Sequence, residues 1–76
     1  MNKEEILREA LVAREQEIMN YQINIDNYTL AIENIKTIGD PDLTDFLQKL
    51  ESLLISEKLE QKKVNIMKLA IEQQLL

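Results

Sequence analysis

The sequence predicts an all-α protein, an antiparallel two-helix hairpin of coiled-coil type, and three observations support this fold class. The only glycine and the only proline of the 76 residues lie close together near the middle of the chain. On both sides of them, apolar residues recur at alternating intervals of three and four, the spacing of a coiled-coil seam. The two halves have similar lengths. We expect a single domain, residues 1–76, with helices over about residues 3–37 and 41–75 and a turn over residues 38–40.

The first helix is expected to begin at about Lys3, because Asn2 and Glu5 have the spacing of a capping box. Arg14 stands at a seam position and is the one break in an otherwise apolar row. Residues 20–29 are rich in Asn and Asp, which compete with the helix for backbone hydrogen bonds, so we expect a bend, a local opening or a functional contact there.

The seam of this first helix, which Arg14 interrupts, consists of Leu7, Leu11, Ile18, Tyr21, Ile25, Tyr28, Ile32 and Ile35.

The turn is specified by three consecutive residues. Gly39 suits the left-handed position that follows a helix C-terminus, since glycine has no Cβ to clash there. Asp40 is a favourable N-cap, and Pro41 fits the first position of a new helix, where its missing N–H is not needed. A link this short joins neighbouring antiparallel helices.

The second helix carries a seam that polar residues interrupt. Glu57, Glu60 and Gln61 occupy the gap, and antiparallel pairing brings Arg14 near the level of residues 61–68. We therefore predict a register-setting polar layer of Arg14, Glu60 and Gln61, within one chain or between two chains. Alternatively, Arg14 lays its methylenes on the seam and keeps its guanidinium in water. The apolar seam residues are Leu43, Phe46, Leu47, Leu50, Leu53, Leu54, Val64, Met67, Ile71 and Leu75.

Both helices also carry a second apolar row on the side away from their seam. A helix of a lone hairpin has one neighbour, so its outer side should be polar. Scattered surface apolar residues would be unremarkable taken singly, but we interpret the rows as a partner or oligomer interface. Homodimerisation into a four-helix bundle, or a larger helical oligomer, would cover them. The predicted interface residues are Val12, Met19, Ile23, Leu30, Ile55, Leu59, Ile66 and Leu69.

Composition argues against several classes of function. The net charge of −5 makes nucleic acid and anionic membranes unfavourable partners. The chain has no histidine and no cysteine, so we expect no catalytic residues, no cofactor-binding residues and no metal site. Glu4 and Glu5 stand where a signal peptide would turn apolar, which favours a cytoplasmic location, in a bacterial host cell if the chain is phage-encoded.

These observations predict a non-enzymatic protein-protein interaction module. It would self-associate and bind a larger protein, as a small inhibitor, adaptor or assembly chaperone of phage or bacterial type. The alternative is a dimeric helical-bundle regulator that contacts nucleic acid through the Lys58–Lys68 face, which includes Lys62 and Lys63. A third possibility is a purely structural assembly piece with no separate target.

Overall fold

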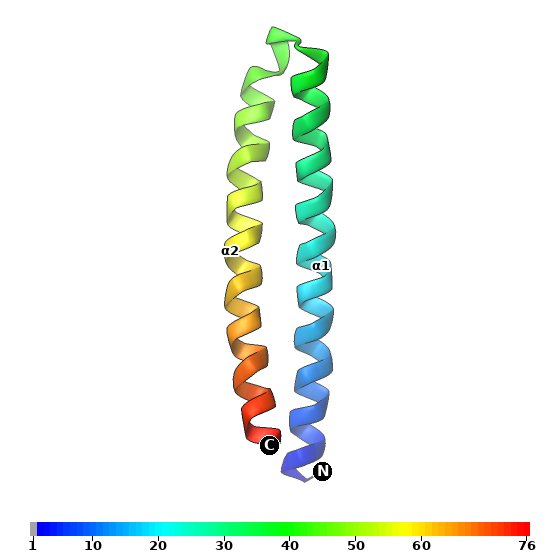
Figure 1. Cartoon of the computed structure of the whole chain (residues 1–76), viewed down its shortest axis with the longest axis vertical. Coiled ribbons are helices and arrows are strands. Elements are labelled where there is room, and N and C mark those ends of the chain that lie inside the picture. The colour runs from blue at the N-terminus through cyan, green and yellow to red at the C-terminus, as the bar shows by residue number, and fades with distance from the viewer. Residues whose placement is uncertain (1) are drawn as a thin grey trace.

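The protein is a long helical hairpin, seen in a computed structural model that describes residues 2–76; Met1, which the predicted domain includes, lies outside the described residues. Helix α1 (Lys3–Ile38) and helix α2 (Thr44–Leu75) are joined through a short 3₁₀ turn (Pro41–Leu43). They run antiparallel, so both ends of the chain lie at the same, open end of the hairpin (Figure 1). The molecule measures 57 × 16 × 14 Å. The predicted all-α fold class is confirmed, and residues 2–76 contain no strand.

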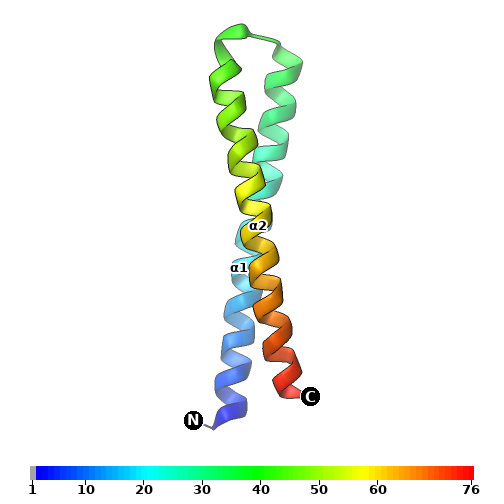
Figure 2. The ribbon, with the colours of Figure 1, turned by 90° about the vertical axis from the view of Figure 1, so that its left-hand side faces the viewer.

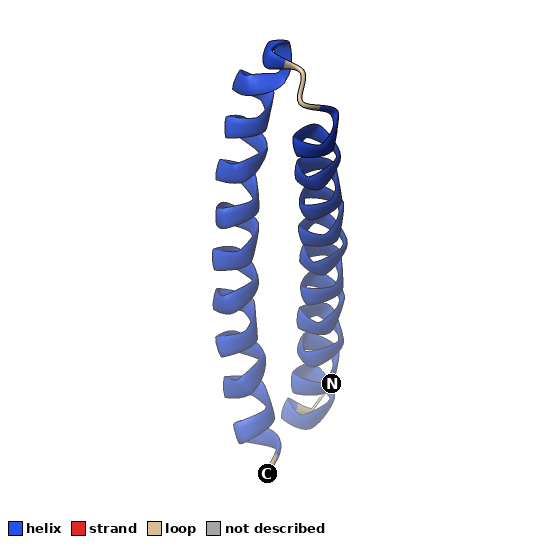
Figure 3. Cartoon of the chain, turned by 45° about the horizontal axis from the view of Figure 1, so that its top comes forward, coloured by secondary structure: helices blue, strands red, loops and turns tan. Residues whose placement is uncertain are grey.

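The predicted capping residues define the helix ends. Asn2 Oδ1 accepts a hydrogen bond from the Glu5 backbone N–H at 2.8 Å and so begins α1. Gly39 ends it with φ of 69°, in the left-handed region, and its N–H donates to the Ile35 carbonyl at 3.0 Å. Asp40 Oδ1 then accepts from the Asp42 N–H at 2.9 Å. The chain reverses within a short loop at the closed end, drawn in tan in Figure 3. The predicted turn chemistry is confirmed, with a 3₁₀ turn in place of the first α-helical turn.

The hydrophobic core lies toward the closed end. Ile32, Ile35 and Leu50 form its buried centre, and Tyr28 and Leu54 are among the half-buried side chains that pack against it. The two helices wrap around each other, so that in the edge view they overlap at mid-length and exchange sides between the two ends (Figure 2). Toward the open end the helices stay paired, but Ile71 is the only buried apolar side chain that α2 contributes there.

Two expectations about the helices differ from the structure. Phe46 and Met67 were placed in the α2 seam, yet they are 51% and 56% exposed. Both residues are at positions that flank the seam, so the neighbouring helix covers only one side of them. The Asn-rich part of α1 has no local opening, because the helix is continuous through residues 20–29, and the Thr29 hydroxyl donates to the Ile25 carbonyl at 2.7 Å. A functional contact in this segment stays a prediction.

Candidate functional site

The outer sides of the two helices form the candidate site. We call Val12, Met19, Ile23 and Leu30 the α1 stripe, and Ile55, Leu59, Ile66 and Leu69 the α2 stripe. All eight side chains are between 51% and 70% exposed, whereas only five apolar side chains of the described chain are buried. The hairpin therefore leaves uncovered every side chain that the sequence assigned to an interface.

The stripes lie on opposite edges of the hairpin. Each occupies heptad positions b and f of its helix, which lie about 130° and 170° around the helix axis from the middle of the a and d seam. Because each seam faces the other helix, the two stripes face away from each other. A single neighbouring hairpin cannot cover both, so the four-helix bundle expected from the sequence would leave one stripe of each chain exposed.

The polar surroundings of the two stripes differ. Along the outer side of α1, Gln16 and Asp26 fill the gaps between the apolar side chains, and Glu9 and Glu33 stand beyond the ends of the stripe. The α2 stripe instead has Lys62 at its centre. The α1 stripe therefore has a carboxylate between its apolar side chains, whereas the α2 stripe has an ammonium group.

The three residues of the predicted register-setting layer do not meet within the one chain. Arg14 Nη2 bonds Glu17 Oε1 of its own helix at 2.6 Å. Glu60 Oε1 bonds Lys63 Nζ at 3.0 Å. Only Gln61 reaches across the hairpin, where its amide donates to the Ile18 carbonyl at 3.3 Å and to Gln22 Oε1 at 3.0 Å. A contact among these groups between two chains stays a prediction.

The register of the hairpin explains why Arg14 stays on its own helix. Lys68 Nζ lies 4.0 Å from Glu15 Oε1, so Lys68 stands at the level of Arg14 and presents a like charge to it. Arg14 is left to pair with a carboxylate one turn away, and its side chain is 32% exposed. Its Nε atom and Glu57 Oε2 are buried, and neither has a hydrogen-bond partner in the described structure. The interrupted seam is thus a weak part of the hairpin.

The Lys58–Lys68 stretch is partly neutralised. Lys63 is bonded to Glu60, and Lys68 lies beside Glu15 of α1. The remaining two lysines, Lys58 and Lys62, are exposed on α2. A dense cationic surface, such as the one that binds a phosphate backbone, needs more uncompensated charge than this.

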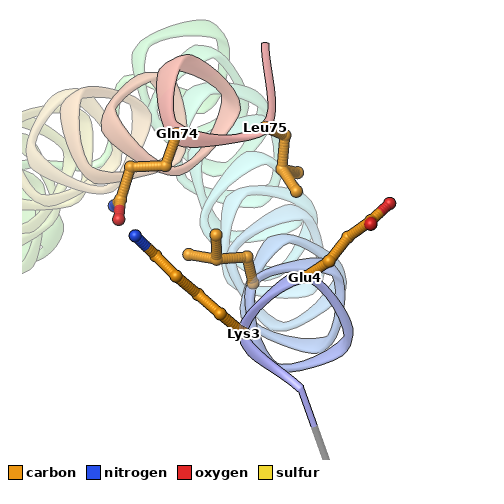
Figure 4. A pocket seen from close by; sticks show the side chains of 5 residues that line it. Lys3, Glu4, Gln74 and Leu75 are labelled. Atoms are coloured by element: carbon orange, nitrogen blue, oxygen red, sulfur yellow. The ribbon is translucent and has the colours of Figure 1, made fainter.

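A small hollow lies between the helix ends at the open end of the hairpin. It has a volume of about 320 Å³ and is lined by Lys3, Glu4, Leu7, Gln74 and Leu75. Figure 4 shows Lys3 and Gln74 on one side of it and Leu75 on the other. These flexible side chains at two helix ends form no constellation of acid, base and nucleophile.

The described residues offer neither a metal site nor a membrane-spanning segment. Among the residues that the structure describes, no cluster of three carboxylates could hold a metal ion. Neither helix, over residues 2–76, has a segment apolar enough and long enough to cross a bilayer. Comparisons with family models, with curated proteins and with solved structures give no match.

Proposed function

We propose that the hairpin is a non-enzymatic interaction module that associates with itself and binds a larger protein. In this function it acts as a small inhibitor, adaptor or assembly chaperone, of the kind that phages and bacteria encode. One observation carries the proposal: two rows of large aliphatic side chains, on opposite edges of a thin rod, are more than half exposed. Large apolar side chains that gather on one exposed side of a helix favour a protein contact there.

The position of the stripes separates the two contacts. Because they face away from each other, a partner on one edge leaves the other edge free for a different protein. Self-association through one stripe and target binding through the other are therefore compatible in the same assembly. Lys62 favours a target that offers a carboxylate among apolar side chains, since burying its ammonium unpaired would be costly.

Charged substitutions in each stripe test the proposal. The double variant Met19→Glu/Ile23→Glu places two carboxylates in the α1 stripe, and Leu59→Glu/Ile66→Glu does the same in the α2 stripe. A matched control, Asn34→Glu/Gln74→Glu, adds the same charge to exposed positions that are neither b nor f and lie outside both stripes. Circular dichroism checks that each variant keeps its helices.

Two readouts follow for each variant. Sedimentation equilibrium measures the mass of the assembly, and affinity capture from the native host identifies a bound protein. We expect at least one stripe variant to lose the assembly and at least one to lose the captured protein, while the control keeps both. Wild-type levels of assembly and capture in both stripe variants would disprove the proposed function.

The nucleic-acid alternative has less support. Of the four lysines on the Lys58–Lys68 face, Lys63 and Lys68 lie beside carboxylates in the structure. The net charge of −5 opposes binding to a polyanion. The exposed stripes have no role in that alternative, whereas the interaction module uses all eight side chains.

A further inference from the structure

We infer that the α1 stripe is occupied by the α1 stripe of a second copy of this chain, running antiparallel to it. The inference rests on the proposed function and names the partner of one of its two surfaces. It follows from the order of side chains along the stripe, from the charges between them, and from the contrast with the α2 stripe.

The α1 stripe is symmetric about its own middle. Met19 and Ile23 are equally far from Tyr21, and so are Val12 and Leu30. A two-fold axis at the level of Tyr21 therefore places Val12 opposite Leu30 of the partner subunit and Met19 opposite Ile23 of the partner subunit. In each pair, a residue at heptad position b faces a residue at position f. Positions a and d face each other in the same way in an antiparallel coiled coil. Every apolar side chain of the stripe meets another apolar side chain.

The antiparallel registers one heptad to either side pair the apolar side chains less completely. A shift by one heptad in one direction sets Leu30 opposite Glu5 of the partner subunit. The same shift in the other direction sets Ile23 opposite Asp26 of the partner subunit. Each shift would bury a carboxylate against a large aliphatic side chain without a partner, which is costly. The pattern of apolar residues thus specifies a single antiparallel register.

Charge selects the antiparallel orientation over the parallel one. In a parallel pair in register, Asp26 and every glutamate of the outer side would face its own copy, like charge against like charge. In the antiparallel pair, Asp26 faces Gln16 of the partner subunit, whose amide can donate to the carboxylate. Glu9 faces Glu33 of the partner subunit only beyond the ends of the stripe, where solvent screens the pair. The contact is also isologous, so it closes as a dimer.

The α2 stripe lacks this self-complementarity because Lys62 interrupts it. No antiparallel register of two α2 stripes pairs all four apolar side chains with one another. In two registers Lys62 faces an aliphatic side chain, Leu59 or Ile66 of the partner subunit. In the two others it faces Ser52 or Gln73 of the partner subunit, and only two of the four stripe side chains pair. A parallel pair places Lys62 opposite its own copy. The α2 stripe is therefore left exposed by the dimer and remains available to a different protein.

A row of small side chains runs along one flank of the α1 stripe. Ala13, Asn20 and Asn27 follow one another at heptad spacing along this side, and all three are exposed. Small side chains at these flanking positions let two helices approach closely. The asparagines, which are weak helix formers in the middle of α1, thus have a role at the rim of the contact. In the antiparallel dimer, Ala13 lies beside Asn27 of the partner subunit.

These flanking positions provide the test, because the chain has no cysteine of its own. The single variants Ala13→Cys and Asn27→Cys leave the whole α1 stripe intact. Each is incubated alone, and the two are incubated together, in a glutathione redox buffer at a concentration where the wild-type chain is associated. We expect a disulfide-linked dimer in the mixture and none in either single variant, since like positions are roughly 20 Å apart at 1.5 Å per residue. Glu51→Cys, on an exposed side of α2, reports random collisions.

The outcomes separate this inference from the proposed function. A disulfide dimer of Ala13→Cys with itself would indicate a parallel pair and overturn the inference. No disulfide in the mixture, although sedimentation shows an assembly, would also overturn it and leave the proposed function standing. A wild-type chain that stays monomeric at every concentration, and captures no protein, would overturn both.

Discussion

Replacement of Glu57 by leucine tests whether the polar gap in the seam weakens the hairpin. Glu57 stands in line with the buried Leu50 of the α2 seam, one turn before Gln61. The contacts of Gln61 with Ile18 and Gln22 set a register in which Glu57 lies at the level of the buried Ile25. Its Oε2 atom is buried without a hydrogen-bond partner in the described structure. Leucine at this position restores the apolar repeat.

The expected gain has two parts. Glu57 Oε2 is buried without a hydrogen-bond partner, and removing it should raise the free energy of unfolding by about 1 kcal/mol. This is the low end of the usual cost of an unsatisfied buried polar group, because the side chain keeps some exposure. Burying the leucine side chain in the same half-covered position contributes about 1 kcal/mol more. A total of about 2 kcal/mol raises the melting temperature of a domain of this size by roughly 8–16 °C.

Thermal denaturation followed by circular dichroism measures the effect, at two protein concentrations so that association is accounted for. The control is Glu51→Leu, the same change at an exposed position of α2, which should alter the stability by no more than about 0.5 kcal/mol. A melting temperature for Glu57→Leu that is lower than wild type, or equal to that of the control, would refute the reasoning.

Three further predictions concern the register, the turn and the alternative function. If Arg14 sets the register between chains, Arg14→Leu changes the oligomer mass in light scattering; a higher melting temperature with an unchanged mass contradicts that role. Gly39→Ala should cost about 1 kcal/mol in urea unfolding, because φ of 69° strains any residue with a Cβ even though the space there is open; unchanged stability would show that the turn relaxes. Any binding to RNA or DNA should weaken steeply with salt and vanish when three lysines become Gln; binding that survives would remove this face as the contact. The three are Lys58, Lys62 and Lys63.

The sequence predicted the fold because its local signals agree. The caps at Asn2 and Asp40, the left-handed Gly39 and the seam repeat all specify the same hairpin. The exposure of the two stripes also follows from the repeat, since a residue opposite the seam has no neighbouring helix to cover it. The structure therefore places all eight stripe side chains on the surface, as the pattern required.

The details of register were harder to predict. An offset of about two turns separates a register in which Arg14 meets Gln61 from the observed one, in which it stands beside Lys68, and the 3₁₀ turn at Pro41–Leu43 helps set that offset. Phe46 and Met67 lie beside the seam, where a wide apolar stripe does not distinguish flanking positions from central ones. The identity of a target has no signature in aliphatic side chains, because they provide apolar area without directional chemistry.

The most direct test of the account is the mass of the wild-type chain over a dilution series by sedimentation equilibrium. We expect the mass to rise from 8.9 kDa toward that of a dimer or larger assembly as concentration increases. The variant Met19→Glu/Ile23→Glu should stay at the mass of one folded chain over the same range. A wild-type chain that is folded and remains at 8.9 kDa throughout would contradict the claim that the α1 stripe is covered by a second copy of this chain.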